Sequence, residues 1–226
     1  MPMTPIPIRP GWSGDLISFL ISVALLVAYH IYLRLRIRQS PTYTVQAVHN
    51  IARAAWVESV MKNGRDILAV QTLRNSTMAA TFLASTAVLL IMGVLSLSGQ
   101  GDKLESTWHV LNVFGATDPT LWLLKLILLM LDLCWAFFCF TLAVRKFNHV
   151  GYLVNLPKDF DHPVITPKYV ASYLNRAGRY YSLGMRAYYF TMPLLFWLFG
   201  PHLMVASSVV LVFLLFHLDR AYDDGD

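Results

Sequence analysis

Long apolar runs alternate with shorter polar segments along this chain, a pattern typical of a protein that crosses a lipid bilayer several times. Leu16 to Leu33 contains one strongly polar side chain, His30, and Thr77 to Leu97 contains no charge. A membrane-spanning helix needs about 20 mostly apolar residues. The two windows therefore predict spans over residues 16–35 and 76–98.

The second half of the chain holds two further apolar windows. Residues 120–144 are long enough to span, although they include Lys125 and Asp132. Leu183 to Leu218 is 36 residues long and is interrupted at Pro193, Gly200 and Pro201. Gly followed by Pro stops helices. The window is therefore either one span or two, at 183–199 and 202–218. Its length favours two, which makes five spans in total, whereas an acidic tail on the outer side favours four.

The polar segment 36–75 predicts an amphipathic helix. Ser40 and Pro41 form a helix start, with a capping side chain before a proline. Apolar residues then recur at helical spacing over Thr42 to Lys62, and Asn63 and Gly64 end the pattern. This helix either lies on the membrane surface or packs against another subunit, or it packs under the protein's own spans. From Arg65 the helical pattern restarts and runs into the second span.

Composition agrees with a membrane protein. Of 226 residues, 56% are hydrophobic and 14% are charged, and the mean hydropathy is +0.52. A soluble domain keeps about a quarter of its residues charged. The first apolar window is too long for a cleavable signal peptide and is followed by the basic stretch RLRIRQ, so we expect it to remain as an anchor. The predicted fold is an all-α polytopic transmembrane bundle of four or five spans with a cytoplasmic amphipathic helix, as a single membrane domain over 1–226.

The distribution of charge predicts the orientation. The connecting segments 36–75 and 145–182, with the arginines that flank them, carry 14 of the 18 Lys and Arg residues but four of the 13 acidic residues. Basic residues near spans stay in the cytoplasm. We expect both segments inside and the N-terminus outside, in a bacterial inner membrane. The net charge of +5 then reflects orientation and attraction to anionic lipid headgroups, and does not indicate nucleic-acid binding.

Arg176, Arg179 and Arg186 approach the last apolar window, with paired tyrosines after two of them. In one interpretation the guanidinium groups extend to lipid phosphates while the tyrosines lie in the headgroup layer. In the other, Arg186 enters the bundle as a fixed positive charge that binds an anion or an acidic partner.

Asp132 lies near the middle of its span, where an aspartate costs about 2.5 to 3.5 kcal/mol to insert. Intramembrane acids face the bundle interior and are candidate functional residues. Asp132 therefore either has a functional or intersubunit role or makes a buried hydrogen bond that serves packing alone. Lys125 lies two turns earlier on the same face, and we expect it to extend outward. His30 is a candidate partner of Asp132, a titratable group or a haem ligand, and the alternative is a hydrogen bond that serves packing alone. A haem would need a second histidine at similar depth, and His217 qualifies only with five spans.

Small residues in the second span form a predicted helix-packing seam. They are Ala80, Ala84, Ala87 and Gly93. Small residues let a second helix approach closely, which favours a packed bundle or an oligomer. A predicted polar collar adjoins the cytoplasmic ends of the helices and comprises Gln71, Arg74, Asn75, Arg176 and Arg179.

No motif of a soluble enzyme or a metal site is visible in the sequence. The histidines are scattered, and Cys134 and Cys139 would lie roughly 8 Å apart on one helix, beyond disulfide reach. We identify no phosphate-binding glycine loop and no nucleophile with identifiable partners. The expectation is a protein without catalytic residues, metal or cofactor.

Four stretches resemble a known family when taken in order. They are YHIYL, NIARAAWVESVM, LAVQTLRNSTMAAT and NRAGRYYSLGMRAYYF. Together they are similar to the bacterial branch of the domain of unknown function 599 family, over about Leu16 to Leu218. The resemblance implies a multi-pass bacterial membrane protein with no established activity. The acidic ending DRAYDDGD departs from the basic tails of that family.

Three functional hypotheses follow. The first is a non-catalytic subunit of a homo-oligomer or a larger membrane complex, packed through the seam and the 42–62 helix. The second is a small oligomeric channel or transporter whose polar path is lined by His30, Arg74, Asp132 and Arg186. The third is a b-type haem or quinone-binding protein.

Overall fold

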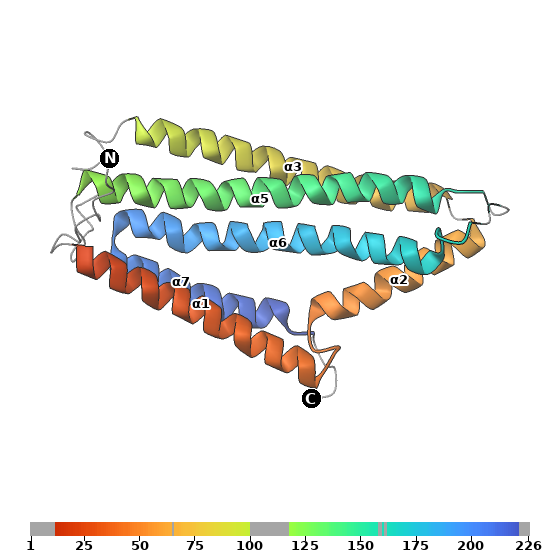
Figure 1. The fold of residues 1–226 in the computed structure, drawn as a ribbon, viewed down its shortest axis with the longest axis horizontal. Coiled ribbons are helices and arrows are strands. Elements are labelled where there is room, and N and C mark those ends of the chain that lie inside the picture. Colours follow the sequence, from red (N-terminus) through yellow and green to blue (C-terminus); the bar gives the residue numbers. More distant parts are fainter. Residues whose placement is uncertain (1–11, 65, 100–117, 158–159, 161, 222–226) are drawn as a thin grey trace, which may run out of the picture. The chain divides into compact units, whose positions relative to one another are not determined.

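The computed structural model describes residues 12–64, 66–99, 118–157, 160 and 162–221. The predicted outer segment from Ser98 to Pro119 lies almost wholly outside these residues, as do the N-terminus and the acidic ending after Ala221. The described residues form helices and no strand, apart from an isolated bridge between Thr44 and Arg220. Figure 1 labels the helices in order: α1 (Ser13–Gln39), α2 (Val45–Asn63), α3 (Asp66–Ser98), α5 (Pro119–Val154), α6 (Pro167–Phe199) and α7 (Pro201–Asp219).

Four of these helices are long and apolar enough to cross a membrane. They are α1, α3 from Ile67, α5 and α7. α6 is not among them, because Arg186 and the tyrosines beside it make its second half more polar. The prediction of an all-α polytopic fold is confirmed. A crossing by residues 183–199 stays a prediction.

The start of α2 differs from its prediction. The helix is capped by Thr44, whose Oγ1 accepts a hydrogen bond from Ala47 N at 3.3 Å, and not by Ser40. Ser40 is used at the end of α1, where its N–H donates to the carbonyl of Arg36. α1 continues beyond its apolar window, so the residues up to Tyr43 become the turn between the helices. The end of α2 at Gly64 is as predicted, with φ 64° and ψ 44° in the left-handed region that glycine tolerates.

α3 runs from Asp66 into the predicted span without a break, as its sequence pattern indicated. α5 continues past the predicted end at Val144 to Val154. The reason is a buried stripe at helical spacing, Ala143, Phe147, Val150 and Val154, which extends the packing beyond the apolar window. α6 passes through Pro193 and ends before Gly200, where the sequence predicted a stop.

The chain divides into two compact units. The described residues of the first unit lie within 1–35, 92–132 and 189–217, and those of the second lie within 36–91, 133–188 and 218–226. In the first unit, buried residues of α5, α6 and α7 form much of the interior, among them Leu126, Leu198 and Leu211. Tyr29 of α1 joins them by donating a hydrogen bond to the carbonyl of Leu215 at 2.9 Å.

In the second unit, α2, α3, α5 and α6 share one apolar core. Val57, Leu73, Val150 and Leu174 represent the four helices there. The predicted alternative that α2 packs under the protein's own helices is therefore the arrangement of this unit, since Val57 and Val60 of α2 are fully buried.

Candidate functional site

The first unit contains a buried ion pair, Asp15 with Lys125, that is also bonded to Trp197. Nζ of Lys125 lies 2.7 Å from Oδ1 of Asp15, and the same oxygen accepts a hydrogen bond from Nε1 of Trp197 at 2.9 Å. Lys125 also donates to the carbonyl of Trp197 at 3.2 Å and lies 5.2 Å from the centre of its indole ring. Asp15 is 0% exposed and Lys125 is 4% exposed.

This arrangement overturns the expectation that Lys125 extends outward. A buried ion pair is retained only when its geometry offsets the cost of removing both charges from water. Here Asp15 and Lys125 form an ion pair with each other, and each also makes a hydrogen bond with Trp197. The cluster therefore fastens α1, α5 and α6 to one another. Sequence reasoning missed Asp15 because it precedes the first apolar window. The available signal was that the predicted orientation puts Asp15 and Lys125 at outer ends of their helices.

Asp132 has a different partner from the one considered in the sequence. Its Oδ2 accepts a hydrogen bond at 2.9 Å from Oγ1 of Thr191 on α6. Nδ1 of His30 instead lies 2.7 Å from the carbonyl of Leu26, one turn earlier on its own helix. His217 makes the same kind of contact with Phe213, at 3.0 Å. The suggested pair of His30 and Asp132 is not formed, and Asp132 remains a half-buried carboxyl group bonded to a neutral hydroxyl.

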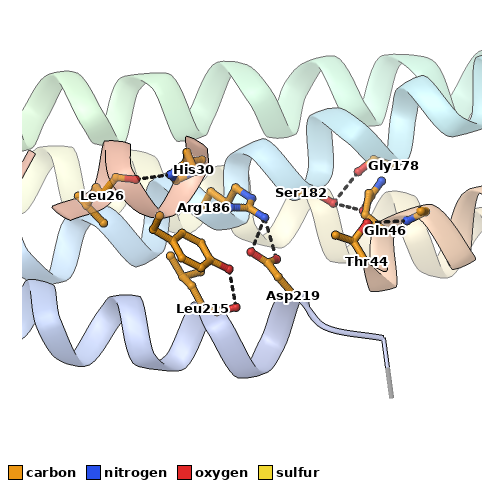
Figure 2. A network of polar contacts seen from close by, with 11 residues as sticks. Leu26, His30, Thr44, Gln46, Gly178, Ser182, Arg186, Leu215 and Asp219 are labelled. Carbon is orange, nitrogen blue, oxygen red and sulfur yellow. Dashed lines mark hydrogen bonds and ion pairs between the residues drawn. The ribbon is translucent and has the colours of Figure 1, made fainter. Parts of the chain in front are cut away.

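Arg186 binds an acidic residue of its own chain. One of its terminal nitrogens, Nη2, lies 2.7 Å from Oδ1 and 2.8 Å from Oδ2 of Asp219, as Figure 2 shows. The side chains are 23% and 19% exposed. Arginine and carboxylate groups make strong, charge-assisted hydrogen bonds. The acidic group beside Arg186 is Asp219 of the same chain, at the end of α7.

Further contacts attach the chain after α7 to the start of α2. Ala221 N donates to the carbonyl of Tyr43 at 3.0 Å, and Arg220 lies over the Tyr43 ring at 6.0 Å. On α6, the hydroxyl of Ser182 lies 2.8 Å from Oε1 of Gln46 (Figure 2). These contacts make α2, α6 and the end of α7 one polar cluster of the second unit.

The predicted seam is used inside the protein over part of its length. Ala80, Ala84 and Ala87 are buried, and Ala84 packs in a small cluster with Phe140 and Ala187. Tyr188 of α6 closes this contact by donating a hydrogen bond to the carbonyl of Leu83. Gly93 is exposed, and a methyl group added there would meet nothing within 4 Å. The seam therefore ends before Gly93.

The residues of the predicted collar lie on the surface. Gln71, Arg74 and Asn75 of α3 and Arg176 and Arg179 of α6 are all exposed. Their exposure suits contact with solvent or lipid headgroups. A neighbouring cation that the sequence analysis did not select, Arg53 of α2, is half-buried. It went unnoticed because Arg53 lies among alternating polar and small residues of an amphipathic helix.

The described residues contain no cluster of three or more His, Cys, Asp and Glu side chains able to hold a metal ion. Both cysteines are free, with Cys139 buried and Cys134 partly buried. Two of the cations, Lys125 and Arg186, are neutralised by carboxylates of the same chain, Asp15 and Asp219.

The comparison with protein families shows which family the chain matches. Residues 17–223 match the family described as protein of unknown function, DUF599. The chain belongs to the DUF599 family. The match extends over nearly the whole chain, so the resemblance inferred from the four sequence stretches is confirmed. No curated protein and no solved structure matches this DUF599 protein.

Proposed function

We propose that this DUF599 protein is a non-catalytic integral protein of the bacterial inner membrane, where it acts as a helix-packing subunit of a homo-oligomer or a larger complex. Its N-terminus lies outside, and α2 lies in the cytoplasm. The proposal fits the two charged clusters, because Asp15 with Lys125 and Arg186 with Asp219 neutralise each other within the chain.

One observation carries the proposal. A groove of about 530 Å³ lies between α3 and α5 of the second unit, and small or hydroxyl-bearing residues line much of it. These are Thr81, Ala84, Ser85 and Thr141, with apolar Val88, Leu89, Phe137 and Val144 completing the walls. Transmembrane helices associate through small residues and hydroxyl groups, which allow close approach and interhelical hydrogen bonds. The groove suits a helix of a second copy.

Native mass spectrometry from mild detergent tests this proposal, because it reports copy number and partners together. We expect wild-type protein to appear as an oligomer or as a stoichiometric complex. Ser85→Leu should shift it to the monomer by filling the groove. Ser96→Leu is the matched control, since Ser96 is also exposed on α3 but does not line the groove. A monomeric wild type, or equal assembly of the two variants, would contradict the subunit role.

A second candidate function is a small channel or transporter, and Asp132 favours it. A half-buried carboxyl group inside a long apolar helix, held by a neutral Thr191 hydroxyl, is a typical feature of ion and proton pathways. Flux into liposomes should then occur with wild-type protein and be lost in Asp132→Asn. Equal flux in both, or an inert wild type across a broad ion panel, would count against it.

A further inference from the structure

Arg53 of α2 is a half-buried cation with a neutral partner. Its Nη1 donates a hydrogen bond at 3.2 Å to Oδ1 of Asn50, one turn earlier on the same helix. Within the described residues no carboxylate pairs with it. Burial lowers the pKa of the Arg53 guanidinium, because the charged form has lost part of its hydration. The described residues of the second unit therefore leave this half-buried positive charge without a paired carboxylate.

Gly178 of α6 provides the surface on which the Arg53 guanidinium rests. A methyl group added at Gly178 would lie 2.4 Å from Nη1, 2.5 Å from Cζ and 2.8 Å from Nη2 of Arg53. The guanidinium thus occupies the space that any side chain at this position would fill. The guanidinium packs directly against the α6 backbone.

The same two residues line a cavity of about 590 Å³. Asn75 and Ser76 of α3 add polar groups to the lining, while Trp56, Phe147 and Tyr181 provide aromatic walls. Most ligand pockets combine apolar walls with a few placed polar groups. This cavity fits a molecule with one anionic group and an apolar body.

We propose that this cavity binds an anionic phospholipid, with its phosphate on Arg53 and an acyl chain along the aromatic walls. Arginine suits phosphate because its planar donors match the phosphate oxygens. A free phosphate ion would leave the apolar walls in contact with water. The segment 36–75 is predicted to lie at the cytoplasmic surface, where anionic lipids and basic segments attract each other. The inference rests on the proposed placement in the membrane and is independent of the subunit role.

The test uses the full-length protein, delipidated in mild detergent, with native mass spectrometry as the readout. The probes are phosphatidylglycerol, phosphatidylcholine with the same acyl chains, and inorganic phosphate. Both lipids carry a phosphate, but the choline cation of phosphatidylcholine offsets that charge and repels the Arg53 guanidinium, whereas the glycerol of phosphatidylglycerol is neutral. We therefore expect phosphatidylglycerol to bind roughly tenfold or more tightly than phosphatidylcholine. Inorganic phosphate alone should not bind. Equal binding of both lipids, or saturation by inorganic phosphate, would overturn the proposal.

Two variants assign the binding to Arg53. Arg53→Gln removes the charge, and Gly178→Ala keeps the charge but displaces the guanidinium, whose flexible end moves at little cost to the fold. Both should lose the preference for phosphatidylglycerol. Gly93→Ala is the matched control for the same glycine-to-alanine change in a helix, because a methyl group there meets nothing within 4 Å. Unchanged lipid preference in Arg53→Gln and Gly178→Ala would refute the site.

The outcomes separate this inference from the subunit role. A lipid-binding monomer would remove the subunit role and leave the Arg53 site intact. An oligomer without lipid preference would support the subunit role and refute the Arg53 site.

Discussion

Nζ of Lys125 and Oδ1 of Asp15 lie 2.7 Å apart and are almost completely shielded from solvent, although the residues lie in the first two turns of two different long apolar helices. The pair shows how this chain carries charge into apolar helices. The charge is matched on another helix, and Trp197 bonds to both partners. Replacing one member of the pair should therefore lower the stability of the protein far more than replacing both.

Asp15→Asn should therefore destabilise the protein by about 3–5 kcal/mol, because Lys125 remains buried without a counter-ion. The double variant Asp15→Asn with Lys125→Met should recover to within about 1–2 kcal/mol of wild type, since it is neutral and keeps an acceptor for Trp197. Thermal or chemical denaturation of the detergent-solubilised protein measures these differences in the free energy of unfolding. If the loss of stability in the double variant equalled the sum of the losses in the two single variants, Asp15 and Lys125 would not stabilise each other.

Gly184 tests the packing of α6 on α5. A methyl group at Gly184 would lie 2.7 Å from Cε1 of Phe140, which is fully buried. Overpacking of this kind costs about 1–3 kcal/mol, so Gly184→Ala should lower the unfolding temperature. Gly151→Ala is the matched control, because a methyl group there meets nothing within 4 Å. It should stabilise the helix by up to about 1 kcal/mol.

Combining Gly184→Ala with Phe140→Leu should restore part of the lost stability, because a smaller side chain relieves the clash. Equal stability of Gly184→Ala and Gly151→Ala would contradict the close contact.

Arg186 and Asp219 should show a measurable coupling free energy. Exposed ion pairs contribute about 0–1 kcal/mol, but this pair is 23% and 19% exposed and makes two hydrogen bonds. A double-mutant cycle with Arg186→Met and Asp219→Asn should give a coupling of about 1–3 kcal/mol. The coupling should persist at high salt, because partly buried pairs are screened less. A coupling that vanishes in salt would place the pair in open solvent.

The predicted orientation can be tested by cysteine labelling of intact cells. In a background with Cys134→Ser and Cys139→Ala, His49→Cys and Ser172→Cys should react with an impermeant maleimide only after the cells are opened. Ser98→Cys should react without opening. All three positions are exposed on their helices, so access depends on the side of the membrane. Labelling of His49→Cys and Ser172→Cys from opposite sides would contradict the orientation.

Local sequence determined much of the fold. The apolar windows predicted α1, α3, α5 and α7, and Gly64 predicted the end of α2. These features follow from the length of a hydrophobic run and from the conformation that one residue prefers, and both are properties of neighbouring residues. For the same reason the sequence could misplace a boundary by a few residues, as at Thr44, where the end of α1 competes for Ser40.

The sequence also determined that Lys125, Asp132 and Arg186 are exceptional, because a charge in an apolar run is costly wherever its partner lies. Only the tertiary structure decided the partners: Asp15 for Lys125, Thr191 for Asp132 and Asp219 for Arg186. It also decided that Arg53 rests on Gly178 beside a cavity. The physical reason is that a buried polar group is stabilised by whichever group the packing of distant helices brings within about 3 Å, and no local pattern encodes that proximity.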